Sequence, residues 1–425
     1  MKIKKFKYEL IKCMCSGNFL KQSRKRLKKF IKSLPKRISK RINKKIAILG
    51  INWLRRSKEI EKDKIFVVTF RGEYDCNAKY ICEEILKRNL PYRIVWTVRK
   101  DRDRGPKAFP QSFTFVQRGS YYFYKHLSSA RLIIDNGVSV AFLNYKKKKG
   151  QTLIETWHGS LGIKKFSPSC QNDKHWVKTA FKEAKMTDYI ISNSTFEDDV
   201  YREDYWKTTP IWRLGHARND ILCEGETQRV KEIRQKVYER LEIPQGAKIC
   251  LYAPTFRDDL DMSSYITDYE RLRDALVNRF GGEWIILTRL HFRLLELLKD
   301  LYLPEFVIDS SRYSDIYEIL ICTDVGITDF SSWICDYMLL RRPGFIYATD
   351  AKDYAENERE LFYPLTDLPF PVSYDMDQLI SNIENFDNDT LVRRCDEFLE
   401  DKGCMDDGHA AERIVDKIQE IMEQK

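Results

Sequence analysis

Histidine and cysteine, the residues that build metal centres and disulfide frameworks, are scarce or scattered in this sequence. It contains six histidines and eleven cysteines among 425 residues. The closest cysteines, Cys13 and Cys15, do not form a CxxC motif, and no group of Cys and His has the spacing of a zinc site. An odd number of scattered cysteines is typical of reduced thiols in a cytosolic protein. The sequence therefore argues against a disulfide-rich or zinc-stabilised fold.

Long apolar runs are also missing. The longest one near the N-terminus, residues 46–54, is interrupted by Asn52 and is too short to span a bilayer. No apolar core with a small-residue cleavage site follows the basic N-terminus, so no secretory signal is predicted. Apolar residues make up 43% of the chain, and neither Gly nor Pro is enriched. These features predict a globular, cytoplasmic protein of two α/β domains.

Acidic residues are almost absent from the first 50 positions, which hold eighteen Lys or Arg against the single acid Glu9. This stretch carries a charge of +17 within a chain of net charge +11, so the remainder sums to −6. Leu27, Phe30, Ile31 and Leu34 share one face of a predicted helix, and basic residues fill the other face. The basic character therefore belongs to one end of the chain and accompanies an apolar stripe.

This combination predicts that residues 1–62 form a basic amphipathic segment that rests on an anionic membrane surface, at the inner face of the cell membrane. The alternative interpretation is a solvated, partly disordered basic tail. Nucleic acid is another anionic partner for such charge, but the apolar stripe favours lipid and no nucleic-acid binding is predicted. The side chains expected to face the headgroups are Lys25, Arg26, Lys28, Lys29, Lys36 and Arg37.

From Lys64 onward, short apolar runs rich in β-branched residues alternate with helical patterns, which predicts βαβ units and parallel sheets. We expect one Rossmann-like domain over residues 63–220 and a second one over 221–400. A helix over 401–425 could pack back on the first domain. Two Rossmann-like domains that face a cleft form the GT-B architecture. Ligands of such open sheets bind at the carboxyl ends of the strands, so the loops that follow strands should carry the chemistry.

Two of the six histidines follow strong strand patterns. His158 comes after LIETW, and His291 comes after WIILTRL. Each should lie at a carboxyl strand end, one in each domain. Imidazole titrates near neutral pH and therefore suits proton transfer to or from a hydroxyl. One such histidine alone is as often a hydrogen-bonded structural residue, but two at equivalent positions favour catalysis.

Several polar residues near these strand ends suit a ligand that bears phosphate. Gly159 permits close approach of backbone to a ligand, and Ser160 adds a hydroxyl. Ser331 and Ser332 open a predicted helix, where N–H groups bind phosphate oxygens. The alternative is an ordinary N-cap. Asp336 falls near the first turn of that helix and could reach ligand hydroxyls.

Arginines supply candidate partners for a pyrophosphate, because the guanidinium group pairs bidentately with phosphate oxygens. Arg218 follows a strand in GHARND, and Arg289 precedes His291 near the end of the predicted strand pattern WIILTRL. Arg257 in APTFRDD is a further candidate, although Asp258 or Asp259 could pair with it instead.

From about Ile65 to its C-terminus, the chain resembles the CDP-glycerol glycerophosphotransferase family of teichoic-acid and capsule polymerases and primases. The resemblance rests on ETWHGSLGIKKF, LGHARND, YAPTFRDD, LTRLH and TDFSSWICDYMLLRRPGFIY, which occur in the family's order. It implies a GT-B fold in which His158 matches the catalytic base and the second domain holds most of the donor. The positions that match donor contacts are Arg218, Pro254, Thr255, Arg289, Leu290, His291, Ser331, Ser332 and Asp336.

The chain departs from the family pattern at three places. Ala217 and Phe292 stand where the family usually has proline, and Ser160-Leu161 stands where it often has Thr-Pro. The last departure borders His158. These changes bear on donor identity and acceptor geometry more than on the class of reaction.

The residues and the resemblance together predict phosphoryl transfer from CDP-glycerol or another CDP-alditol to a lipid-linked or polysaccharide acceptor. The acceptor hydroxyl attacks the β-phosphorus, His158 takes its proton, and CMP leaves. His291 and the arginines would stabilise charge on the pyrophosphate. No DxD-like motif follows a strand, so no obligatory metal or cofactor is predicted; the alternative is that Asp329 and Asp336 serve as metal ligands. The alternative is a GT-B glycosyltransferase that uses a nucleotide sugar, because it shares the fold.

Overall fold

The computed structural model describes residues 48–424, except 71, 100–108, 172, 256, 258–264, 266–267, 291–302 and 355–359. The chain divides into two compact units, Met1–Glu59 and Ile60–Lys425. In the first unit, the described part includes a helix over residues 48–57. His291 lies outside the described residues, as do the side chains predicted to face a membrane, namely Lys25, Arg26, Lys28, Lys29, Lys36 and Arg37.

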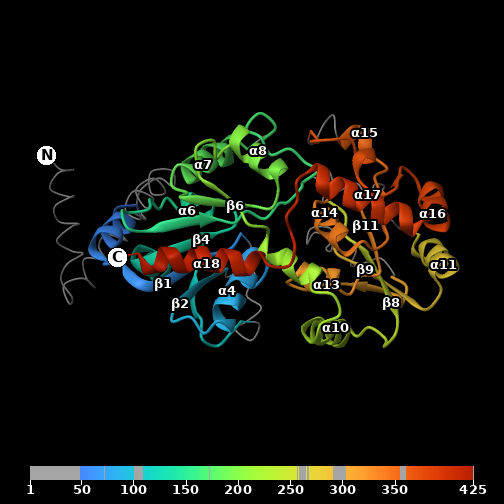
Figure 1. Ribbon diagram of the computed structural model, residues 1–425, viewed down its shortest axis with the longest axis horizontal. Coiled ribbons are helices and arrows are strands. Elements are labelled where there is room, and N and C mark those ends of the chain that lie inside the picture. Colours follow the sequence, from blue (N-terminus) through green and yellow to red (C-terminus); the bar gives the residue numbers. More distant parts are fainter. Residues whose placement is uncertain are drawn as a thin grey trace, which may run out of the picture. The chain divides into compact units, whose positions relative to one another are not determined.

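The second unit begins with a seven-stranded parallel sheet (Figure 1). Its strand order is β3-β2-β1-β4-β5-β6-β7. The central strands are apolar runs buried on both faces, as parallel strands covered by helices require. Asp135 pairs in register with Glu155, so the carboxyl ends of β4 and β5 lie side by side. The strands are β1 (Glu61–Val68), β2 (Arg93–Val98), β3 (Thr114–Gln117), β4 (Ala130–Asp135), β5 (Thr152–Glu155), β6 (Tyr189–Ser192) and β7 (Ile211–Arg213).

Short capped helices connect these strands. The Ser120, Asp173 and Ser194 side chains accept hydrogen bonds from backbone N–H groups at the starts of their helices, which stabilises those helix ends. The three capped helices, α5, α7 and α8, therefore begin where a Ser or Asp precedes an amphipathic run. The elements are α4 (Cys76–Lys87), α5 (Tyr121–Ser129), α6 (Ser139–Phe142), α7 (Lys174–Ala184), α8 (Thr195–Glu203), the 3-10 helix η3 (Ala217–Asn219) and α9 (Asp220–Cys223).

A second parallel sheet of six strands follows, in the order β10-β9-β8-β11-β12-β13 (Figure 1). The predicted α/β class with two parallel sheets is thus confirmed. The strand order reverses between β8 and β11, as it does between β1 and β4 in the first sheet. The strands are β8 (Lys248–Tyr252), β9 (Trp284–Thr288), β10 (Val307–Asp309), β11 (Val325–Thr328), β12 (Gly344–Tyr347) and β13 (Val372–Ser373).

The helices of this half differ widely in length. The elements are α10 (Gln228–Leu241), α11 (Tyr269–Phe280), α13 (Ile316–Leu320), α14 (Trp333–Tyr337), η5 (Met338–Leu340), α15 (Ala351–Asp353), η7 (Leu365–Asp367), α16 (Met376–Glu384) and α17 (Asn388–Asp401).

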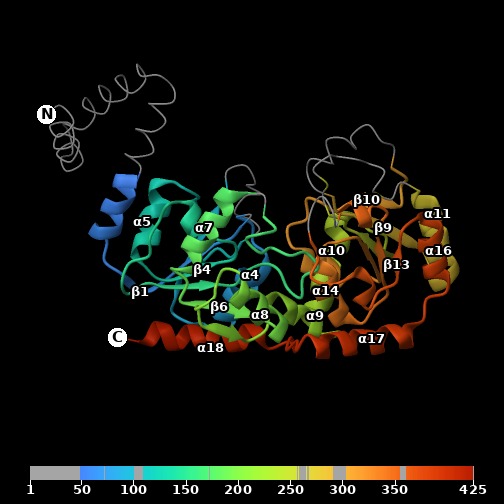
Figure 2. The ribbon, with the colours of Figure 1, turned by 90° about the horizontal axis from the view of Figure 1, so that it is seen from above.

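The final helix, α18 (Ala410–Glu423), leads from the second half back to the first, where it contacts α4, β4 and η3 (Figure 2). Its N-terminus is capped by Asp220, whose carboxylate accepts the N–H groups of Ala410 and Ala411 at 2.9 and 2.7 Å. Its apolar face is buried through Ala411, Ile414, Val415, Ile418 and Ile421. Among the helices that the structure describes, none has the length and apolarity needed to cross a membrane.

Candidate functional site

A pocket of about 190 Å³ lies where predicted residues from both halves meet. It brings His158, Gly159 and Ser160, which follow β5, together with Ser332, which follows β11. Its full lining is Trp157, His158, Gly159, Ser160, Gly162, Lys164, Phe166, Phe196, Glu197, Val200, Tyr201, Ser332 and Phe362. The pocket therefore lies at carboxyl strand ends, as the rule for open parallel sheets predicts.

The orientation of His158 is fixed from one side of its ring. Its Nδ1 lies 2.6 Å from the backbone carbonyl oxygen of Asn136. A carbonyl oxygen only accepts, so Nδ1 carries a proton, and in the neutral form of the ring Nε2 then carries the lone pair. Phe70 stacks on the imidazole at a centroid distance of 5.3 Å and an angle of 3°. His158 is itself exposed, so this tautomer presents a basic nitrogen at the surface of the pocket.

The backbone beside His158 is strained. Trp157 has φ 51° and Val138, two residues after Asn136, has φ 61°. Left-handed backbone is costly for large and β-branched residues. The Glu155 carboxyl group accepts both backbone N–H groups, from Trp157 at 2.8 Å and from Val138 at 3.3 Å. The next residue but one, Gly159, packs closely against the Trp157 ring, since a Cβ at position 159 would lie 2.9 Å from Trp157 Nε1.

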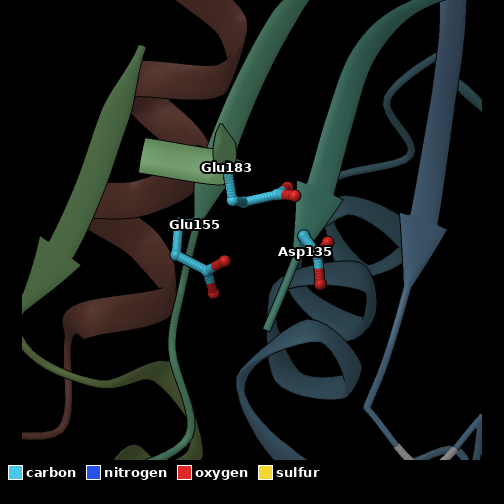
Figure 3. Close-up of side chains that lie close together, drawn as sticks. All are labelled: Asp135, Glu155 and Glu183. Atoms are coloured by element: carbon cyan, nitrogen blue, oxygen red, sulfur yellow. The ribbon is translucent and has the colours of Figure 1, made fainter. Parts of the chain in front are cut away.

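Glu155 belongs to a buried cluster with Asp135 and Glu183 (Figure 3). One ligand-type oxygen from each lies within 4.8 Å of the others. Burial raises the pKa of all three carboxyl groups, and repulsion from Asp135 raises the pKa of Glu155 and Glu183 further. The backbone N–H groups of residues 137–141 all donate into this cluster. These dipoles direct their positive ends at the carboxyl groups, which stabilises negative charge and opposes a bound cation.

Sequence reasoning did not single out this cluster. Two of its members were visible as acids at the ends of apolar strand patterns, Asp135 in LIID and Glu155 in LIE. A carboxylate that ends a buried strand was thus the available signal. Glu183 lies on α7 and carries no such mark, since its partners are more than 25 residues distant in the sequence.

Arg218 and Asp336, both predicted to contact the donor, form a buried ion pair. They are 1% and 3% exposed, and Arg218 Nη2 lies 3.2 Å from Asp336 Oδ2. Although burial opposes charge, the carboxylate of Asp336 holds the pKa of Arg218 above its ordinary value. Arg218 also donates to the carbonyl oxygen of Gly159 at 2.6 Å, and Tyr317 donates to Asp336 at 2.6 Å. The pair thus supports the pocket wall from behind and does not line it.

A polar network ties Ser160 to the C-terminal segment. Asn193 donates to Ser160 Oγ at 3.0 Å and to Asp406 at 2.6 Å. Asp406 also accepts from Asn219 at 2.7 Å and from the backbone N–H of His216 at 2.7 Å. The sequence analysis did not find Asn193 or Asp406, because nothing local links residues more than 200 positions apart.

Lys164 connects the pocket with the second half. Its Nζ lies 3.3 Å from Thr255 Oγ1, and its backbone forms an isolated antiparallel bridge with Leu361. Thr255 and Pro254, both half-buried, follow β8, and the Thr255 N–H donates to Asp329 at 2.7 Å. The predicted donor contacts at Pro254 and Thr255 therefore lie next to a pocket lysine.

The remaining predicted residues lie at strand ends of the second half. Arg289 donates to the carbonyl oxygens of Ser310 and Tyr313, and Leu290 is buried. Ser331 and Ser332 are half-buried before α14. Ser332 makes no capping hydrogen bond within the described part of the chain, which differs from an ordinary N-cap.

Arg257, the further candidate, pairs with two acids of the second half, whereas Asp258 and Asp259, the acids considered from the sequence, lie outside the described residues. Its guanidinium group contacts Asp350 at 2.6 and 2.9 Å and Asp329 at 2.8 Å. It is 2% exposed and stacks over the rings of Phe330 and Tyr354. Arg257 is thus buried among residues that follow β8 and β11.

Comparison with known proteins places this geometry in a family. The profile of "CDP-Glycerol:Poly(glycerophosphate) glycerophosphotransferase" matches residues 51–420. A teichoic acid poly(glycerol phosphate) polymerase of Staphylococcus epidermidis is 29% identical over 87% of this chain and 52% of its own length. A teichoic acid glycerol-phosphate transferase of Staphylococcus aureus is 27% identical over 85% of this chain and 94% of its own. The chain thus spans about half of the former relative and nearly all of the latter.

A teichoic acid ribitol-phosphate primase of Bacillus spizizenii is 25% identical over 85% of this chain and 92% of its own length. Among solved structures, the wall teichoic acid polymerase TagF has a TM-score of 0.76 and 27% identity, covering 91% of this chain and 96% of that one. A putative UDP-N-acetylglucosamine 2-epimerase of Listeria monocytogenes shares the fold at a TM-score of 0.52 and 12% identity, covering 86% of this chain and 98% of that one.

Proposed function

This chain belongs to the CDP-glycerol:poly(glycerophosphate) glycerophosphotransferase family, and from that premise we propose that it transfers glycerol phosphate, or a related alditol phosphate, from a CDP-alditol to an acceptor hydroxyl. The acceptor is a lipid-linked molecule or a growing polymer of the teichoic-acid or capsule type. The names of the relatives, which include glycerol-phosphate and ribitol-phosphate enzymes, support this substrate class.

The observation that carries the proposal is the hydrogen bond between His158 Nδ1 and the carbonyl oxygen of Asn136. With Nδ1 donating to Asn136, Nε2 accepts the proton of the acceptor hydroxyl as its oxygen attacks the β-phosphorus. A new P–O ester bond forms, the P–O bond of the pyrophosphate breaks, and the electron pair leaves with CMP. General-base help of this kind contributes about 10²–10⁴-fold to a rate.

We propose that the donor is held mainly by residues 221–400 and the acceptor by residues 63–220. Lys164 and Ser332, which line the pocket, would stabilise charge on the pyrophosphate, together with Thr255 and Arg289 at neighbouring strand ends. Arg218 and Asp336 would act through Gly159 and not by direct contact with the donor. His291 stays a predicted second catalytic residue. The transfer moves no electrons between redox states, so it requires no redox cofactor.

The test is release of nucleoside monophosphate or diphosphate from candidate donors. The purified protein is incubated with CDP-glycerol, CDP-ribitol or UDP-sugars and a lipid-linked acceptor, and CMP and UDP are separated by chromatography. We expect CMP from one of the CDP-alditols, dependent on acceptor. Release of UDP without CMP would identify a nucleotide-sugar glycosyltransferase instead and would overturn the proposal.

We further propose that the enzyme works at the inner face of the cell membrane, held there by its basic N-terminus. The support is the +17 charge of residues 1–50, since each basic residue near an anionic leaflet contributes about 1 kcal/mol. Deletion of residues 1–50 should weaken binding to phosphatidylglycerol liposomes in low salt by at least about tenfold, and turnover on a soluble acceptor should persist. Sedimentation with liposomes measures the affinity, and an unchanged affinity would refute the membrane role.

A further inference from the structure

We propose that Glu155 is a positioning residue for His158, because its carboxyl group holds the two left-handed residues that set where the imidazole ring lies. This inference rests on the proposed function, in which His158 is the base. Glu155 ends β5 and is fully buried, so it never touches a substrate. Its effect on catalysis must pass through the backbone.

Glu155 holds both sides of the hydrogen bond that orients the ring. On one side, it accepts the N–H of Trp157, the residue before His158. On the other, it accepts the N–H of Val138, two residues after Asn136, whose carbonyl oxygen bonds Nδ1 of the ring. Donor and acceptor of the 2.6 Å bond thus depend on one carboxyl group.

Val138 and Trp157 both adopt backbone conformations that persist only when the surrounding structure holds them. Val138 is β-branched and Trp157 is bulky, and both have positive φ, where such residues are genuine outliers. Strained backbone of this kind survives when surrounding structure over-determines it, and it concentrates at functional sites. Without the Glu155 contacts, either peptide can relax to ordinary φ values and carry its hydrogen-bonding group away from the ring.

The neighbouring carboxyl groups provide a matched control. Both oxygens of Glu155 accept backbone N–H groups, so a glutamine there must direct its NH₂ group at a donor. Glu183 differs, because its Oε2 accepts from Ala141 while its other oxygen accepts no backbone N–H group of the described residues and the side chain interacts with Asp135. Figure 3 shows the Glu183 side chain directed at Asp135. A glutamine at 183 can keep the Ala141 bond and donate its NH₂ to Asp135.

The experiment compares Glu155→Gln with Glu183→Gln in the full-length protein. Displacement of a reacting group by about 1 Å costs about 10²-fold in rate. We therefore expect Glu155→Gln to lower kcat for CMP release by about 10²-fold, with KM for CDP-glycerol changed less than about twofold. Glu183→Gln should stay within about threefold of the parent in both values.

A second readout does not depend on turnover. Histidine ¹⁵N NMR reports which ring nitrogen carries the proton, and the His158 signal is assigned by its loss in His158→Gln. The parent should show the Nδ1–H tautomer, and Glu155→Gln should show a mixture. If the parent releases no CMP but the tautomer shifts as expected, the proposed function fails while the positioning role stands.

The positive φ of Val138 suggests a further variant. Glycine adopts positive φ without penalty, so Val138→Gly added to Glu155→Gln should recover at least about tenfold of the lost kcat. Recovery would also show that a chain with glutamine at position 155 can fold. Parental kcat and tautomer in Glu155→Gln, or an equal loss in Glu183→Gln, would overturn the proposal.

Discussion

Replacing His158 with alanine should lower kcat for CMP release by about 10³-fold, within the 10²–10⁴ that a general base contributes. The loss should fall on kcat and leave KM for the donor nearly unchanged, because the ring accepts a proton from the acceptor hydroxyl and not from the donor. Asn136 and Phe70 hold the ring on the protein side. Steady-state kinetics with CDP-glycerol and a soluble acceptor measures both values.

The matched control is His175→Ala. His175 is exposed on α7, and its ring contacts Phe142, outside the pocket lining. This variant should keep kcat within about twofold. A His158→Ala enzyme that released CMP at the parental rate would remove His158 from its role, whatever the control showed.

Replacing Asp336 with asparagine should lower the free energy of unfolding by about 3–5 kcal/mol, the cost of leaving a buried charge without its partner. Arg218 is 1% exposed, so solvent cannot compensate. Asp336 also accepts from Tyr317 and Asn219, and an amide NH₂ must face one of these donors. A domain is stable by about 5–15 kcal/mol in all, so the variant should unfold at a much lower urea concentration, followed by tryptophan fluorescence.

Arg393→Ala is the control for that variant. Arg393 and Glu397 form an exposed pair one helical turn apart, and such pairs contribute about 0.3–0.5 kcal/mol. The urea midpoint of Arg393→Ala should therefore match the parent closely. If Asp336→Asn cost less than about 1 kcal/mol, the Arg218 charge would have another partner and the support of Gly159 would need a different explanation.

Much of the architecture could be predicted from local sequence. Runs such as IFVV and LII are apolar and contain β-branched residues, a pattern typical of a parallel strand covered on both faces. The place of His158 followed from that, because a histidine after a buried strand must lie at the carboxyl edge of the sheet. The pocket at this edge contains it.

The environment of Arg218 could not be predicted in the same way. From the sequence it was an arginine after a strand, suited to a pyrophosphate. Its partner Asp336 stands 118 residues away, and no local pattern reveals which two side chains a fold will bury together. The proposed role of Glu155 could not be predicted from the sequence either. It depends on the positive φ angles of Val138 and Trp157, and ordinary residue preferences assign positive φ to neither residue.

The return of α18 to the first half has a consequence for synthesis on the ribosome. The chain is made from its N-terminus, and domains generally begin to fold in that order. Yet the first sheet is covered in part by residues 410–423, and Asp406 completes the network around Ser160. The first half therefore cannot bury its full core until residues 410–423 emerge, and a nascent chain stalled before residue 406 would hold His158 without a finished site.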